Sequence, residues 1–171
     1  MKKISILFAL FILTVFVSCG QKKKETTAKN QNKVDIPVYN FNELEPLLYT
    51  ETNKTYIINF WAMWCAPCVK ELPYIEEYER KNKNVEVILV SLDFPEDIET
   101  KLKPFLAKKK ISSKVVVLDD PDANTWINKI DKNWSGAIPF TIIFNAEKRF
   151  FYERSFEDLH DLETEILKNF N

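Results

Sequence analysis

Glycine and histidine are scarce in this chain of 171 residues. It has two glycines, Gly20 and Gly136, and one histidine, His160. Phosphate-binding loops and dinucleotide fingerprints both need several closely spaced glycines, so the sequence excludes both kinds of site. His160 stands far from the cysteines in the sequence, and we expect it to be a surface residue rather than a catalytic base.

Cysteine is also rare, with one residue near the N-terminus, Cys19, and a pair at Cys65 and Cys68. A structural zinc site needs four ligands, and Cys19 and His160 do not complete the pair at any zinc-like spacing. The acidic segment Asp119–Asp122 is typical of a turn followed by a helix start rather than of a metal loop. The sequence therefore predicts no metal and no organic cofactor.

The most informative feature present is the segment Cys65-Ala66-Pro67-Cys68. It places two thiols one helical turn apart, where an apolar, strand-like run gives way to a helical pattern. Unpaired N–H groups and the positive dipole end at a helix start favour a thiolate at Cys65. Cys68 is then close enough to resolve a mixed disulfide. A structural disulfide is the plain alternative, but this position beside Trp64 favours a reversible redox pair.

The N-terminal residues resemble an export signal. Two lysines precede Ile4–Val17, an apolar stretch of about fourteen residues that is short for a transmembrane helix. The following Ser18-Cys19-Gly20 resembles a bacterial lipoprotein processing site, although Phe16 stands where leucine is usual. We therefore expect residues 1–18 to be a signal peptide and Cys19 to be lipidated, which also accounts for the odd cysteine. An uncleaved membrane anchor is the alternative.

Residues 19–33 are rich in lysine, asparagine, threonine and glutamine, without an apolar period, and predict a disordered tether. The tether holds five lysines and one glutamate, whereas the whole chain has 24 basic and 25 acidic residues. The folded part is therefore acidic. A basic tether suits an anionic membrane surface, and an acidic domain argues against nucleic-acid binding. The lysines also fit the simpler role of keeping the tether solvated.

Residues 34–171 are long enough for one domain with its own core. Short runs rich in Ile, Val and Phe predict buried strands, and a tight connection predicts a closing hairpin: Tyr56–Ala62, Val85–Leu92, Val115–Leu118, Phe140–Asn145 and Lys148–Glu153. Helical spacing of apolar residues predicts helices at Asn42–Tyr49, Cys65–Lys81, Glu96–Lys109, Asp122–Ile130 and Phe156–Phe170. This alternation predicts an α/β domain with a central mixed β-sheet flanked by helices, ending in a β-hairpin and a helix.

Over residues 34–171 the chain resembles the TlpA-like family of membrane-anchored thiol–disulfide oxidoreductases, which have the thioredoxin fold. The run Asn59–Cys68 matches that family's active-site segment, and Val69–Pro73 continues it with a helix-kinking proline. Ile138–Thr141 resembles the family's cis-proline loop, with Phe140 where threonine is frequent.

The resemblance implies that Cys65 attacks and that Cys68 is the buried resolving thiol. It also implies a cis Pro139 opposite the disulfide, where the Ile138 backbone pairs with an extended substrate. Without the CxxC motif, a trans proline at a strand start would be the favoured interpretation of Pro139. We expect the substrate to contact a set of residues around the dithiol, namely Trp64, Ala66, Pro67, Ile138 and Pro139.

Proton transfer needs a different residue from the one that thioredoxin uses. Thioredoxin has a buried aspartate where this chain has Asn59, which cannot titrate. Glu71 stands three residues after Cys68 and shares its helix face, and the TlpA-like family has glutamate there. Our hypothesis is that Glu71 accepts the Cys68 proton. The alternative is an ordinary exposed glutamate balanced by Lys70.

Together these features predict an exported, lipid-anchored thiol–disulfide oxidoreductase. The family resemblance implies a reductant of exported protein disulfides, with a role in cytochrome c maturation and a transmembrane electron carrier as its own reductant. Two alternatives belong to other classes. One is a peroxidase of the peroxiredoxin group, whose reactive cysteine usually lacks a CxxC partner. The other is a redox-inactive binding module, which the intact Cys65, Cys68 and Glu71 argue against.

Overall fold

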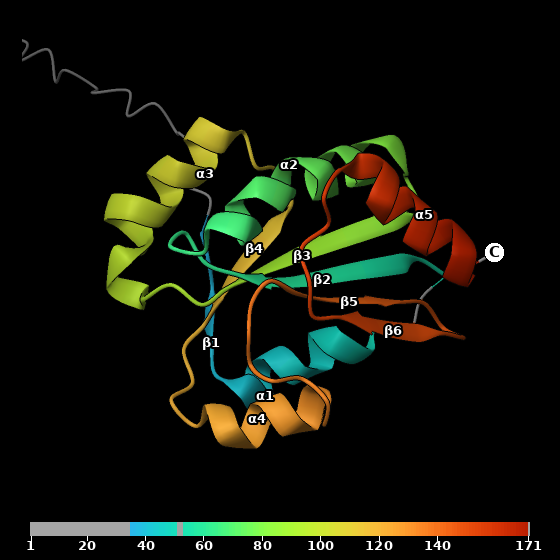
Figure 1. Ribbon diagram of the computed structural model, residues 1–171. Coiled ribbons are helices and arrows are strands. Elements are labelled where there is room, and N and C mark those ends of the chain that lie inside the picture. Colours follow the sequence, from blue (N-terminus) through green and yellow to red (C-terminus); the bar gives the residue numbers. More distant parts are fainter. Residues whose placement is uncertain (1–34, 51–52, 171) are drawn as a thin grey trace, which may run out of the picture. The chain divides into compact units, whose positions relative to one another are not determined.

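The computed structural model describes residues 35–50 and 53–170. Their centre is a six-stranded sheet in the order β1 (Val38–Tyr39), β4 (Lys114–Leu118), β3 (Val85–Ser91), β2 (Thr55–Trp61), β5 (Phe140–Phe144) and β6 (Arg149–Tyr152) (Figure 1). The first four are parallel neighbours, whereas β5 is antiparallel to β2 and to β6. The sheet is therefore mixed and ends in a hairpin, as predicted. The predicted signal peptide, Cys19 and tether lie outside the described residues.

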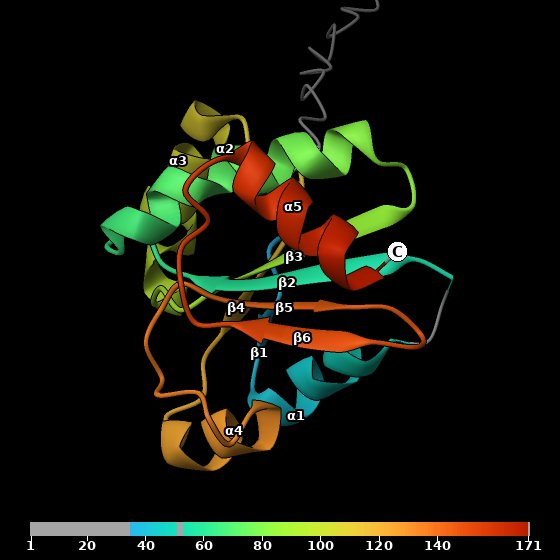
Figure 2. The ribbon, with the colours of Figure 1, turned by 45° about the vertical axis from the view of Figure 1, so that its right-hand side comes forward.

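Helices cover both faces of the sheet (Figure 2). One face carries α2 (Ala66–Lys81), α3 (Lys103–Lys109) and α5 (Leu159–Phe170), and the other carries α1 (Phe41–Leu44) and α4 (Ala123–Ile130). Each face has its own apolar core, and the active-site cysteines belong to the core under α2. Within residues 35–50 and 53–170, no helix is both long and apolar enough to cross a membrane.

Strand β2 lies between the two cores and explains the unbroken apolar run in its sequence. Ile57 and Trp61 enter the core under α2, whereas Ile58 and Phe60 enter the opposite core. A strand that is buried on both faces needs no polar alternation. Asn59 shares the α2 face with Ile57 and Trp61 because strand side chains alternate, so its amide points beneath the active-site helix.

Prolines account for two differences from the predicted helices. The predicted helix Asn42–Tyr49 is α1 followed by a 3₁₀ helix at Glu45–Tyr49, whose second residue is Pro46. The predicted helix Glu96–Lys109 is a 3₁₀ turn at Pro95–Asp97, a π-helical turn at Ile98–Leu102, and then α3 with Pro104 in its first turn. Proline has no N–H to donate within a helix, so regular α-helical bonding is interrupted at each position.

Two further elements differ from expectation. The short edge strand β1 was not predicted, because its two residues are too few to show a period. The last helix begins at Leu159 rather than at Phe156. The Asp158 carboxylate accepts the Asp161 N–H at 2.8 Å, as a helix cap does, which leaves Phe156 in the preceding loop. That loop lies against the active site.

Candidate active site

The two cysteines lie where β2 passes through a short turn into α2. Cys65 is the N-cap residue of α2, in extended conformation, and its Sγ accepts the Cys68 N–H at 3.3 Å. The pair forms a disulfide with its Cα atoms 5.3 Å apart. Cys65 is 6% exposed and Cys68 is 0% exposed. The pair is therefore asymmetric, because Cys65 is the nearer of the two to solvent.

The loop after β3 braces the turn that precedes Cys65. The Asp93 carboxylate accepts the Met63 N–H at 3.0 and 3.2 Å, and it accepts the Ser91 hydroxyl at 2.8 Å. The Leu92 N–H also donates to the Trp61 carbonyl at 2.8 Å. Asp93 is buried, so these charge-assisted bonds fix the loop next to the dithiol.

The loop before β5 faces the disulfide from the other side. The Ile138–Pro139 peptide bond is cis, which confirms that part of the prediction. The Ile138 carbonyl oxygen lies 3.7 Å from Cys65 Sγ, within reach of a thiol at that position when the pair is reduced. Upstream, Gly136 has a φ of 89°, and the Trp134 indole N–H donates to the Ala137 carbonyl at 2.8 Å. The loop is therefore held by its own hydrogen bonds.

Glu71 lies on the buried face of α2 and is fully buried, so the alternative of an exposed surface glutamate is wrong. The Asn59 side-chain N–H donates to Glu71 Oε1 at 2.8 Å and to the Thr141 hydroxyl at 2.9 Å. The Phe156 backbone N–H donates to Glu71 Oε2 at 2.7 Å. The Glu71 side chain, which projects from α2, is thus hydrogen-bonded to β2 on one side and to the β6–α5 loop on the other.

Burial is the largest influence on the ionisation of Glu71. Desolvation raises the pKa of Glu71 from 4.5 to about 7, because burial removes water that would stabilise the charged carboxylate. Hydrogen bonds from the Phe156 N–H, Asn59 and Ser155, together with the charge of Arg154, act in the opposite direction and lower this pKa. A carboxyl group with a pKa near 7 can both accept and release a proton at neutral pH.

The surface around Cys65 contains most of the predicted substrate-contacting residues. Trp64 is 68% exposed, Ala66 and Pro67 are also exposed, and Ile138 is partly exposed. Pro139 is buried behind them. The fold thus brings these residues to the cysteines from two distant segments. His160 is exposed near the start of α5, as expected, and no group of three or more His, Cys, Asp or Glu residues in the described part could hold a metal ion.

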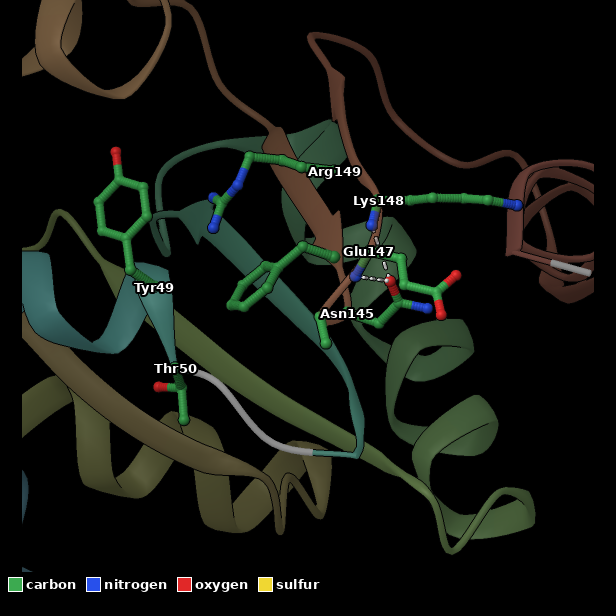
Figure 3. A pocket seen from close by; sticks show the side chains of 8 residues that line it. Tyr49, Thr50, Asn145, Glu147, Lys148 and Arg149 are labelled. Carbon is green, nitrogen blue, oxygen red and sulfur yellow. Dashed lines mark hydrogen bonds between the residues drawn. The ribbon is translucent and has the colours of Figure 1, made fainter.

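A shallow hollow of about 250 Å³ lies away from this chemistry, between the 3₁₀ helix after α1 and the β5–β6 turn (Figure 3). The Arg149 guanidinium stacks over Tyr49 at 4.7 Å and over Phe144 at 4.2 Å, and it donates to the Leu48 carbonyl. Phe144 pairs with Tyr56 near the start of β2, whereas Cys65 follows the end of that strand. The hollow is therefore at the opposite end of the sheet from the dithiol.

A family model described as the AhpC/TSA family matches residues 19–150 of the chain. The chain belongs to the AhpC/TSA family. Among curated family relatives, a thiol-disulfide oxidoreductase ResA of Bacillus cereus is 30% identical over 127 residues, which are 68% of this chain and 72% of that protein. ResA of Oceanobacillus iheyensis is 50% identical over 42 residues, which are 23% of this chain and 22% of that protein.

Solved structures agree on the fold. The thioredoxin-related protein from Neisseria meningitidis serogroup B superposes with a TM-score of 0.56 at 22% identity, over 70% of this chain and 87% of that one. A DsbF homologue from Corynebacterium diphtheriae gives 0.53 at 23% identity, over 68% and 73%. With its thioredoxin fold, its CxxC disulfide and its ResA relatives, the protein is a thiol–disulfide oxidoreductase, consistent with the TlpA-like resemblance.

Several residues near the dithiol were not expected from the sequence. Asp93 and Ser91 brace the active-site turn from the end of β3, and Thr141 and the Phe156 N–H complete the surroundings of Asn59 and Glu71. The proline loop that contains Thr141 predicts roles for Ile138 and Pro139 but none for Thr141. A backbone N–H that lies 85 residues from its acceptor leaves no trace in the sequence pattern.

Proposed function

We propose that this protein is an exported, lipid-anchored reductant of protein disulfides. The single observation that carries the exchange chemistry is the asymmetry of the pair, in which Cys65 borders the exposed Trp64, Ala66 and Pro67 while Cys68 is fully buried. The reducing direction rests on the family resemblance. A partner disulfide has access to one sulfur only. The lipid at Cys19 and the export signal rest on the N-terminal sequence.

The reaction balances as two thiol–disulfide exchanges. The Cys65 thiolate attacks one sulfur of the substrate disulfide, forms a mixed disulfide and releases the other substrate sulfur as a thiolate. Cys68 then loses its proton and attacks Cys65 Sγ, which releases the second substrate thiolate and leaves the Cys65–Cys68 disulfide. Two electrons pass to the substrate, so a partner must return two electrons before the next cycle.

In this scheme Glu71 accepts the Cys68 proton during the second exchange. Both side chains are fully buried on one face of α2, and a Glu71 pKa of about 7 suits transfer near neutral pH. Replacing Glu71 with Gln keeps the shape and removes the titration. The pH dependence of mixed-disulfide resolution should then flatten between about pH 6 and 8, the range set by that pKa. An unchanged pH profile in Glu71→Gln would show that another group accepts the proton.

The most direct test of the assigned roles uses single cysteine variants of the full chain. Cys68→Ser should accumulate a mixed disulfide between Cys65 and an oxidised protein substrate, because no resolving thiol remains. Cys65→Ser should form no such adduct at an appreciable rate, since Cys68 is buried. Equal trapping by both variants would contradict the assignment of attacking and resolving thiols.

Substrate and electron source follow from the family resemblance. The substrates are oxidised dithiols of exported proteins, with apocytochrome c as one candidate, and the electrons come from a transmembrane carrier protein. A reduced protein that consumes peroxide stoichiometrically but leaves protein disulfides intact would instead favour the peroxidase. Failure to cycle between dithiol and disulfide would favour the binding module.

A further inference from the structure

An exposed aromatic residue, Phe94, lies on the loop that braces the active-site turn. The carboxylate of its neighbour Asp93 binds the Met63 N–H at 3.0 Å. Met63 is in turn followed by Trp64. One partly buried hydrogen bond therefore joins two chain segments, and in each of them the next residue is an exposed aromatic. Phe94 is 65% exposed and Trp64 is 68% exposed.

The local structure gives no reason for phenylalanine at this position. Phe94 is the N-cap of the 3₁₀ turn Pro95–Asp97, where a polar side chain usually accepts a backbone N–H, and it makes no such bond. It also adds little to the core, since Phe94 belongs to neither apolar cluster and the buried part of β3 ends at Ser91. An exposed aromatic ring on a loop that is bonded to the turn before Cys65 suits contact with a partner.

We propose that Phe94 and Trp64 form a two-aromatic contact surface beside Cys65, and that this surface binds an apolar side chain adjacent to the attacked cysteine of the substrate protein. Phe94 is then a specificity-determining residue. The proposal rests on the proposed function and names the chemistry of its substrates. Glu96 lies exposed two residues beyond Phe94, so an acidic residue at the same substrate position is disfavoured.

The test uses three disulfide substrates. Two are disulfide-bonded peptides of equal length, which differ only in whether leucine or serine flanks the cysteines. The third is a neutral small molecule, bis(2-hydroxyethyl) disulfide. The second-order rate constant of each is measured with the reduced full chain. Phe94→Ala should lower the rate constant for the leucine peptide by about tenfold. The rate constants for the serine peptide and the small disulfide should stay at the wild-type level.

Leu167→Ala is the matched control, because Leu167 is also an exposed apolar residue, at 60%, but lies on α5. It should leave all three rate constants unchanged. An equal loss on all three substrates in Phe94→Ala, or no loss on the leucine peptide, would overturn the inference. The small disulfide separates this result from the proposed function, since a wild-type protein that reduces none of the three substrates would overturn both.

Discussion

The ionisation of Glu71 affects both the proposed chemistry and the stability of this protein. Its carboxyl group is completely buried, with the Asn59 amide donating to one oxygen and the Phe156 N–H to the other. Hydrogen bonds from the Phe156 N–H, Asn59 and Ser155 partly compensate the desolvation of a charge, and the pKa of Glu71 still rises to about 7. The ionised form is therefore destabilising, which is the condition that makes it a competent proton acceptor.

This pKa predicts a pH-dependent stability. The folded pKa of about 7 lies above the unfolded value of 4.5, so the folded state binds more protons between them. Stability is full below about pH 4.5 and falls as pH rises through 7, by up to about 3 kcal/mol. Chemical denaturation of the oxidised protein at about pH 5 and pH 8 should show this loss, and Glu71→Gln should lack it. An equal pH slope in the variant would contradict the prediction.

Asn59 provides a second prediction at the same position. In Asn59→Asp a second carboxyl group faces Glu71, where the wild type has an amide donor. Two buried acids in contact resist double ionisation, so the pair should hold one shared proton to higher pH. The variant should lose about one and a half times as much stability between about pH 5 and pH 8 as the wild type does, because one proton stays bound across that whole range. A loss of the same size at both pH values would indicate a packing defect instead.

At the scale of elements, the β6–α5 loop covers the buried carboxyl group. Arg154 donates to both Asp161 oxygens, at 2.6 and 2.9 Å, and its guanidinium lies 4.7 Å from the centre of the Phe156 ring. The Ser155 hydroxyl reaches the Pro67 carbonyl at 3.3 Å, in the first turn of α2. The loop therefore joins the start of α5 to the active-site helix and presents the Phe156 N–H to Glu71.

Loosening this loop should change the ionisation of Glu71. Arg154→Met keeps an apolar stem, removes the pair with Asp161 and takes away a positive charge that lowers the pKa of Glu71. The midpoint of the pH profile for mixed-disulfide resolution should move to higher pH. Loss of the partly exposed ion pair should lower the free energy of unfolding by about 1 kcal/mol. Lys101→Met, which removes the more exposed pair with Asp97, is the control. A shift that is equal in both variants would contradict a specific role for the loop.

Elements with a strong local pattern were predictable, and contacts between distant elements were not. The strand before Cys65 and the helix after it follow from an apolar run and from helical spacing. The position of Asp93 beneath Met63 depends on how the loop after β3 meets the turn after β2, 30 residues earlier. The burial of Glu71 depends likewise on a loop 85 residues away, and its helical position alone is equally compatible with solvent.

At the scale of the molecule, the sheet separates two cores, and the dithiol belongs to one of them. Its position at the end of β2, the start of α2 and the loop before β5 follows from the order of the strands, which brings Ile138 to Cys65 across 73 residues. The motifs made this fold predictable, because the active-site segment and the proline loop are each tied to one place in it. The exposed Phe94 belongs to neither motif and was found only in the structure.

The central claim is that Cys65 and Cys68 form a reversible couple suited to reducing other proteins. Equilibration of the full chain with defined thiol–disulfide buffers gives the reduction potential of the pair. We expect a value near or below about −250 mV, in the range of thioredoxin. A value near about −120 mV would make the protein an oxidant and contradict the proposed direction. The lack of any reversible couple would contradict the enzymatic function itself.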